Sequence, residues 1–240
     1  MNGAVYAVVP AAGAGKRMGS AVPKQYLELA GRSVLEHTLW RLAGHALIQK
    51  VVVAISAGDE YFEDLRAKLP GKVSSAAGGA ERCHSVLSAL HALAAHAGPD
   101  DWVLVHDAAR PCVRITDLDR MLVTLGDDEV GGILAAPVRD TLKRCDAHGA
   151  IIATVDRTQL WHALTPQMFR LGTLTGAIET ALADGVVVTD EAQAIERIGL
   201  TPRVVAGSAD NLKITHPEDL ALAGMILAAQ AQAARGGPTQ

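Results

Sequence analysis

The chain has 240 residues, a length that allows one large α/β domain or two small ones. Hydrophobic residues make up 49% and aromatic residues 3%, so the core must be aliphatic, and a disordered or collagen-like chain is excluded. Lysine and arginine together number 22 against 26 acidic residues, a formal net charge of −4. This balance argues against the broad basic face of a nucleic-acid-binding protein, so any polyanion site must be local.

The cysteines and the N-terminus indicate the compartment. The three cysteines are odd in number and widely spaced, without the C-x-x-C pair of a zinc or redox site. The first apolar stretch has no basic residue ahead of it, unlike a secretory signal peptide. Uncharged runs such as 220–234 fall short of the ~20 apolar residues of a membrane helix. We therefore expect a cytoplasmic protein that binds neither membrane nor nucleic acid.

Buried strands and helices alternate through the first 136 residues. Apolar runs predict strands at residues 5–9, 51–55, 73–77, 102–105 and 132–136. Periodic patterns and capping signals predict helices at residues 33–42, 59–69, about 82–95 and 116–125. Such alternation is typical of an α/β fold, and here it predicts a doubly wound, mostly parallel, Rossmann-like sheet.

The alternation of buried strands and helices is interrupted over residues 138–165. Alternating segments at 141–145 and 150–155 flank the turn AHG, which predicts a β-arm projecting from the sheet. Helices are expected again at 166–183 and 189–198, and from 215 to about 234, where THPE has the spacing of a capping box. Because no linker or composition shift marks a boundary, we expect a single domain over 1–240, with 138–165 as a protruding dimerisation arm.

The arm also carries polar residues that favour a homodimer. Thr141, Arg144 and Arg157 lie within it, and such side chains are costly in a purely structural flap. An isolated two-stranded ribbon is marginally stable in water, so this one needs a partner surface. A twofold axis would supply the same ribbon from a second subunit, and each site would then borrow residues from its neighbour.

The loop after the first strand, PAAGAGKRMGSAVPK, has the character of a phosphate-binding loop. Its glycines begin a dinucleotide fingerprint without completing it, and the Lys16-Arg17 pair does not fit a Walker A loop. Small residues nevertheless allow backbone amides to approach a phosphate, and Lys24 adds a third positive charge. We expect a triphosphate cradle of a different design; the alternative is a solvated basic loop.

Two further loops follow strands at the same expected edge of the sheet. HDAARP places Asp107 and Arg110 there, and a carboxylate at that point could hold Mg²⁺ between phosphates, or simply cap a turn. His106, beside an apolar strand, is better explained as a hydrogen-bonded core histidine. In GGAERCHS the paired glycines would let a ring approach the backbone, while Arg82 and Ser85 offer polar contacts.

These residues resemble the 2-C-methyl-D-erythritol 4-phosphate cytidylyltransferase family of the non-mevalonate isoprenoid pathway. The resemblance covers nearly the whole chain, in the family's order, through PAAGAGKRM, PKQY, GGxxR, VLVHDAARPC, GGILAAPVRDTLKR, TVDR, LWHALTPQ, VTDEA and DNLKIT. It implies a nucleotidyltransferase-type fold and a homodimer. It also implies in-line attack of the acceptor phosphate on the α-phosphorus of CTP, which yields 4-diphosphocytidyl-2-C-methyl-D-erythritol and pyrophosphate.

The resemblance also implies roles for individual residues. Arg17 and Lys24 would stabilise the charged transition state, while Lys213 and Arg157 would orient the attacking phosphate. Residues that match the acceptor site are Asp107, which we also expect to bind the metal, Arg110 and Thr141. Residues that match the CTP-binding loops are Ala11, Ala12, Gly13, Gly79, Ala80, Ser85 and Ala108. Many members carry an acidic residue where this chain has Ala80, so backbone groups are left to read the base.

Other functions fit parts of the sequence. A cytidylyltransferase acting on another polyol phosphate, such as ribitol 5-phosphate, would share the fold, although residues 139–141 with TVDR and TPQ favour methylerythritol phosphate. A regulatory module would bind the nucleotide without releasing pyrophosphate. A nicotinamide-dependent oxidoreductase is disfavoured by the incomplete glycine pattern and by Ser56, where an acidic residue is expected. A hydrolase would need a G-x-S-x-G elbow, which the sequence lacks.

Overall fold

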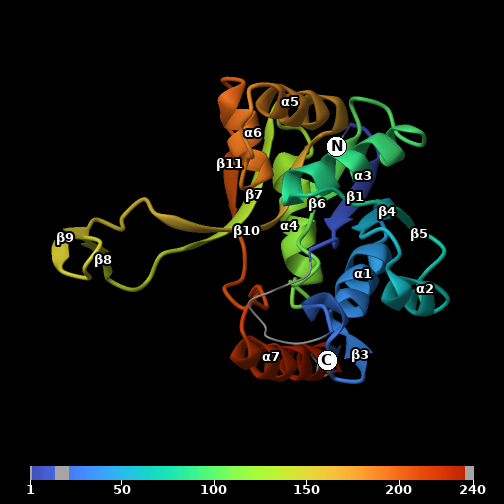
Figure 1. Cartoon of the computed structure of the whole chain (residues 1–240), viewed down its shortest axis with the longest axis horizontal. Helices are drawn as coiled ribbons and strands as arrows, with labels where there is room; N and C mark the ends of the chain where they lie inside the picture. The colour runs from blue at the N-terminus through green and yellow to red at the C-terminus, as the bar shows by residue number, and fades with distance from the viewer. Residues whose placement is uncertain (1, 14–21, 236–240) are drawn as a thin grey trace, which may run out of the picture.

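A computed structural model describes residues 2–13 and 22–235 (Figure 1). Its central sheet has seven strands in the order β11-β7-β10-β6-β1-β4-β5. Six of these strands are mutually parallel, and β10 runs antiparallel to both of its neighbours. Their bounds are β1 Val5–Pro10, β4 Ile48–Ile55, β5 Val73–Ala77, β6 Trp102–Val105, β7 Gly131–Pro137, β10 Trp161–Arg170 and β11 Arg203–Ala206. The expected mostly parallel sheet is confirmed.

Helices cover both faces of this sheet. Successive side chains of a strand point to opposite faces, so Val5, Ala7 and Val9 pack with α1, α2 and α4, whereas Tyr6 and Val8 pack with α3, α5 and α6. The helices are α1 Val34–Gly44, α2 Glu60–Arg66, α3 Arg82–Ala94, α4 Ile115–Leu125, α5 Leu171–Ala183, α6 Glu191–Arg197 and α7 Pro217–Arg235. A strand covered on both sides needs a continuous apolar run, which VYAVV supplies. In the described ranges no helix has the length and apolar character required to cross a bilayer.

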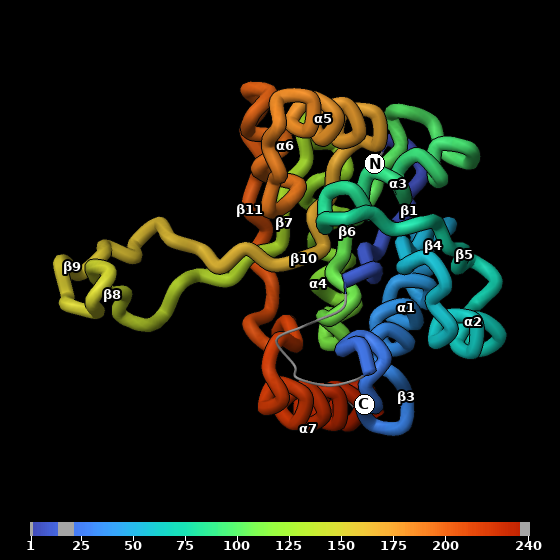
Figure 2. Tube along the Cα trace, viewed as in Figure 1, coloured from blue at the N-terminus to red at the C-terminus, as the bar shows by residue number. Residues whose placement is uncertain are grey.

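The C-terminal helix α7 lies off the sheet, beside the small hairpin formed by β2 (Glu28–Leu29) and β3 (Arg32–Ser33) (Figure 2). Leu29 and Ile214 share an apolar cluster with Leu227 of this helix. The helix begins at Pro217, and Asp219 accepts hydrogen bonds from the amides of residues 215 and 216, each at 2.8 Å. This interaction takes the place of the capping box that THPE predicts.

The arm leaves the body between β7 and β10 and ends in the ribbon of β8 (Leu142–Cys145) and β9 (Ile151–Val155) (Figure 1). The hairpin prediction is confirmed, but residues 161–165 of the expected arm belong to β10, which pairs with β7. The helix predicted from residue 166 is wrong over its first turn, because residues 166–170 complete β10 and α5 begins at Leu171. Pairing with β6 and β7 on its two sides holds this segment as a strand.

Candidate active site

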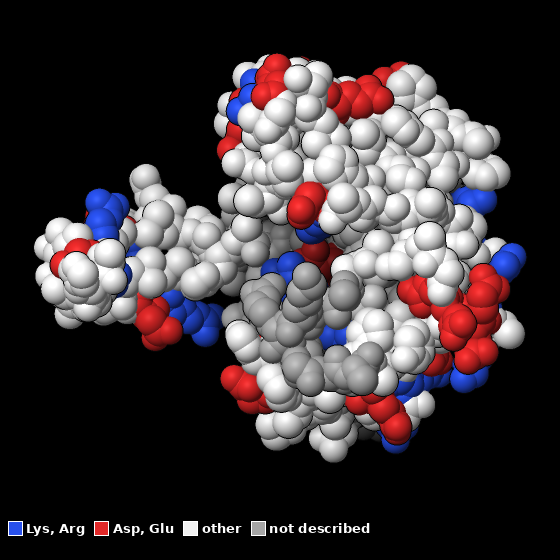
Figure 3. Space-filling model, viewed as in Figure 1, with Lys and Arg blue, Asp and Glu red and all other residues white. Residues whose placement is uncertain are grey.

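Loops at the carboxyl edge of the parallel strands surround a cavity of about 390 Å³, within the usual range for small-molecule sites. Ten of the expected site residues line it, namely Ala11, Ala12, Gly13, Lys24, Gly79, Ala80, Ser85, Asp107, Ala108 and Lys213. Five further residues complete the lining, namely Pro10, Gln25, Glu81, Arg82 and Ala109. Figure 3 shows acidic and basic atoms meeting in a hollow near the centre of this face. Arg17, expected here, lies outside the described residues.

Hydrogen bonds fix the start of the first loop from two sides. The Ala11 amide donates to the carbonyl of Ala54 at 2.7 Å, and the Ala11 carbonyl accepts from Gln25 Nε2, also at 2.7 Å. Ser56 Oγ donates to the Ala12 carbonyl at 2.8 Å. Gln25 comes from the short 3₁₀ helix Lys24–Tyr26 and is 4% exposed. The sequence did not assign it a role, and its place in PKQY was its only signal.

The paired glycines let the second loop pack against the first. A Cβ on Gly78 would lie 2.2 Å from the Cβ of Ala12, so a larger residue cannot fit without moving a loop. The amide of Gly79 donates to Ser85 Oγ at 3.0 Å, and that hydroxyl lies 3.3 Å from the Glu81 carbonyl. Ser85 is 3% exposed, so its side chain shapes the loop that frames the cavity.

Asp107 lies at the centre of a cluster of cations on the cavity floor. Its Oδ1 accepts from Arg82 Nε at 3.1 Å, and its Oδ2 is 3.3 Å from Arg110 Nε and 2.9 Å from Lys213 Nζ. Burial alone would raise the pKa of this carboxyl, but the three cations outweigh that effect and hold the pKa well below its ordinary value. Asp107 is therefore an anion that anchors the surrounding positive charges.

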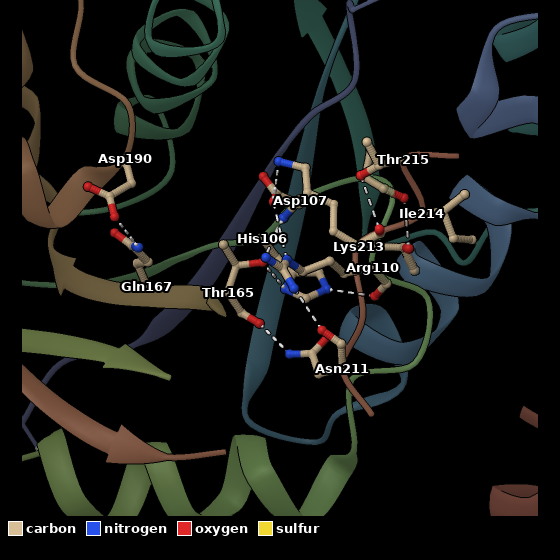
Figure 4. A network of polar contacts seen from close by, with 12 residues as sticks. His106, Asp107, Arg110, Thr165, Gln167, Asp190, Asn211, Lys213, Ile214 and Thr215 are labelled. Atoms are coloured by element: carbon tan, nitrogen blue, oxygen red, sulfur yellow. Dashed lines mark hydrogen bonds and ion pairs between the residues drawn. The ribbon is translucent and has the colours of Figure 1, made fainter. Parts of the chain in front are cut away.

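The backbone of Asp107 is held by a second buried chain of hydrogen bonds (Figure 4). Its amide donates to Thr165 Oγ1 at 3.0 Å, and this hydroxyl also lies 3.0 Å from His106 Nδ1. The other ring nitrogen of His106 is 3.0 Å from the Arg110 carbonyl, which can only accept, so Nε2 carries the proton. Burial lowers the pKa of His106 to about 4, which leaves a neutral ring. The expectation of a hydrogen-bonded core histidine is confirmed.

The other expected cations occupy different positions. Arg110 is buried behind Asp107 and donates from Nη1 to the Asn211 carbonyl at 2.7 Å. Lys24 Nζ donates to the Ile214 carbonyl at 3.0 Å, one residue beyond Lys213. Lys24 and Lys213 thus reach the same cavity from segments that are far apart in the sequence.

Thr141 and Arg157 lie in the arm, and neither is among the described residues that line the cavity. They face each other across the base of the ribbon, with Arg157 Nη1 3.4 Å from Thr141 Oγ1. Both are exposed. Within one chain, therefore, the fold separates these two residues from the other expected acceptor ligands.

Within residues 2–13 and 22–235, no group of three or more histidine, cysteine or acidic side chains is arranged to hold a metal ion. Asp107 nevertheless presents a carboxylate to the cavity. Mg²⁺ is commonly held by one or two carboxylates together with substrate phosphates and water. One carboxylate whose two oxygens already contact three cations cannot hold a resident ion by itself, so an ion here would need to bring phosphate and water ligands with it.

Comparison with known proteins places this geometry in a family. The profile described as 2-C-methyl-D-erythritol 4-phosphate cytidylyltransferase matches residues 5–229. Proteins of that name are 56% identical over 218 residues in Pseudomonas putida and 54% identical over 224 residues in Aeromonas hydrophila; each alignment spans at least 90% of both chains. A crystal structure of 4-diphosphocytidyl-2C-methyl-D-erythritol synthase superimposes with a TM-score of 0.82 at 37% identity, covering 94% of this chain and all of the other. The chain belongs to the 2-C-methyl-D-erythritol 4-phosphate cytidylyltransferase family.

Proposed function

We propose that the protein transfers CMP from CTP to 2-C-methyl-D-erythritol 4-phosphate. A phosphate oxygen of the acceptor forms a bond to the α-phosphorus of CTP, and the bond from that phosphorus to the β-phosphate oxygen breaks. The products are 4-diphosphocytidyl-2-C-methyl-D-erythritol and pyrophosphate. Such a reaction needs positioning and preorganised positive charge more than acid or base catalysis.

The observation that carries this proposal is the cavity at the sheet edge, where small-residue loops face a cluster of cations. Ala11, Ala12 and Gly13 allow a nucleotide to approach the backbone, and Gly79 and Ala80 frame the base position. Because Ala80 has no polar side chain, the backbone on this side would read the base. The cations in the lining favour a nucleoside triphosphate over an uncharged ligand.

We assign the transition-state charge to Lys24, together with Arg17 from the same loop. Lys24 lines the cavity, and its bond to the Ile214 carbonyl directs its ammonium group toward the Lys213 segment. Lys213, fixed by Asp107 at 2.9 Å, would orient the attacking phosphate. Arg110 would act from behind Asp107, by holding that carboxylate in place.

We propose that Mg²⁺ enters with the triphosphate and is held there by Asp107, where it would neutralise phosphate charge. Excess chelator should abolish turnover, and restored Mg²⁺ should recover it. Asp107→Asn removes the anionic ligand, so a titration should show a higher Mg²⁺ concentration at half-maximal rate. Full turnover in excess chelator would exclude the metal from the reaction.

A coupled pyrophosphate assay tests the reaction. Protein, Mg²⁺ and CTP should release pyrophosphate only when methylerythritol phosphate is added. Substituting ribitol 5-phosphate tests the rival acceptor, and substituting ATP, GTP or UTP tests the base preference near Ala80. Nucleotide binding without release with any acceptor would instead support a regulatory module.

We also propose that the enzyme acts in the cytoplasm as a homodimer. Its three cysteines are free thiols, two of them buried, which suits a reducing compartment. The exposed apolar side chains of the arm include Ile151, Ile152 and Leu160, and a partner subunit would cover them.

A further inference from the structure

Arg82 lines the cavity, but its guanidinium donors are already engaged by two buried carboxylates, one of which, Glu191, is not among the lining residues. Nη1 and Nη2 donate to the two carboxylate oxygens of Glu191 at 2.6 and 3.1 Å, and Nε donates to Asp107. Glu191 is 1% exposed, and the Arg82 side chain is 25% exposed. An arginine at a polyanion site normally offers that fork to a phosphate. Here a buried carboxylate occupies it.

Glu191 is itself held rigidly at the first residue of α6. Asp190 caps this helix by accepting from the amide of Gln193 at 2.9 Å. Gln167 of β10 makes two hydrogen bonds to the same turn. Its Nε2 donates to Asp190 at 3.0 Å (Figure 4). Its Oε1 accepts from the Ala192 amide at 2.8 Å. The position of Glu191 is therefore set by the central sheet and does not depend on Arg82 alone.

Charge explains why this arrangement matters. Burial raises the pKa of Glu191, and its two hydrogen bonds from Arg82 oppose that effect by favouring the ionised form. With Glu191 and Asp107 ionised beside Arg82, Arg110 and Lys213, the connected cluster has a formal charge of +1. If Glu191 is replaced by a neutral residue, the charge becomes +2, and at least one N–H group of the Arg82 fork loses its acceptor. Arg82 would then keep only Asp107 as an ionic partner, and because a partly buried charge that is not fully compensated is costly, an anion in the cavity would be favoured as the replacement.

We propose that Glu191 is a positioning residue. By pairing with Arg82, it prevents that guanidinium from binding the phosphates and holds it in place against Asp107. This inference rests on the proposed function, since the phosphates concerned are those of CTP and pyrophosphate. With Glu191 in place, Arg82 holds Oδ1 of Asp107 while Oδ2 anchors Lys213. Released, Arg82 would bind the leaving pyrophosphate and allow the Asp107 carboxylate to turn.

The test is the variant Glu191→Gln, which keeps the size of the side chain and removes its charge. Direct calorimetry should show pyrophosphate binding about tenfold tighter than in the wild type, in line with a charged hydrogen bond gained. Turnover should fall while KM for CTP does not rise. The matched control is Asp117→Asn: Asp117 is also a fully buried carboxylate paired with an arginine, Arg120 at 2.8 Å, but it lies outside the cavity lining. The Asp117→Asn variant should be less stable than the wild type, and its affinity for pyrophosphate should be unchanged.

The double variant Arg82→Gln with Glu191→Gln should return pyrophosphate affinity to the wild-type value, because no free fork remains. Glu191→Asp keeps the charge but is one methylene shorter, so it should give an intermediate affinity, and it replaces Glu191→Gln if that variant does not fold. Unchanged pyrophosphate binding in the folded single variant, or tighter binding that survives in the double variant, overturns the inference. Wild-type protein that fails to release pyrophosphate with CTP and acceptor would refute the proposed function instead.

Discussion

Lys24 is a cation of the cavity whose contribution to turnover can be tested separately. Its ammonium group is held at the Ile214 carbonyl beside the cavity floor, so its charge is in place before substrate binds. Removing one such preorganised charge typically costs ~10²–10³ in turnover. Lys24→Ala should therefore lower kcat by about this factor with a modest change in KM for CTP, measured by pyrophosphate release. Lys68→Ala removes an exposed lysine as control, and near-normal turnover of Lys24→Ala would refute the assignment.

His106 makes the stability of the fold depend on pH. Burial lowers its pKa in the native state to about 4, whereas the unfolded chain titrates near the ordinary 6.5. Between these values the unfolded state binds a proton that the native state does not, so the free energy of unfolding falls as the pH falls. The contribution of this one group to that loss is about 3 kcal/mol.

The variant His106→Gln isolates this effect, because an amide can donate to the Arg110 carbonyl and accept from Thr165 without titrating. Urea unfolding at pH 7 and pH 4 should show a smaller loss of stability in the variant than in the wild type. His148→Gln, at an exposed position in the arm, should keep the wild-type loss. Equal losses in all three proteins would mean that another group carries the acid sensitivity.

The residues around the cavity were predictable where a strand end preceded them. Asp107 and the loop of Ala11 to Gly13 follow apolar strands, so the topology of a parallel sheet alone brings them to one edge. Glu191 and Gln25 follow no strand, and their roles depend on side chains that meet only in the folded chain. The sequence positions of Glu191 and Gln25 do not show which residues they contact in the folded chain.

Among the elements, the contact between the first two loops gives a sharp test. A Cβ on Gly78 would lie 2.2 Å from Ala12 and 3.0 Å from the Ile55 carbonyl, so Gly78→Ala must displace backbone at this edge of the cavity. We expect KM for CTP to rise at least severalfold and stability to fall by about 1–3 kcal/mol, measured by steady-state kinetics and urea unfolding. Gly176→Ala places its Cβ in open space on helix α5 and should be neutral or slightly stabilising. Unchanged kinetics in Gly78→Ala would show that the loops pack independently.

Element type was predictable for the buried parallel strands and for the helices that follow them, because their apolar patterns are continuous. β10 was mistaken for a helix over residues 166–170, since a proline inside a run argues against a central strand. The strand tolerates Pro166 where its pairing with β7 is irregular, between Ala163 and Gln167. β11 lies at the sheet edge with three of its four residues exposed, so it lacks the continuous buried run that identified β6.

The whole molecule consists of a body that holds the cavity and an arm that extends away from it (Figure 1). Thr141 and Arg157 are near the base of the ribbon, and the other expected ligands that the structure describes lie in the body. If all of them serve one reaction, the acceptor site must combine the body of one subunit with the arm of another. A twofold homodimer provides that arrangement twice.

Complementation between inactive variants tests this arrangement. Lys24→Ala damages the body and Arg157→Ala damages the arm, and each alone should be nearly inactive. When equal amounts exchange subunits, each heterodimer has one site with both lesions and one with neither. Half of the dimers are then heterodimers with one intact site, so pyrophosphate release should recover to about a quarter of the wild-type rate. No recovery, with exchange verified by native mass spectrometry of differently tagged chains, would mean that Arg157 acts within its own chain or has no part in turnover.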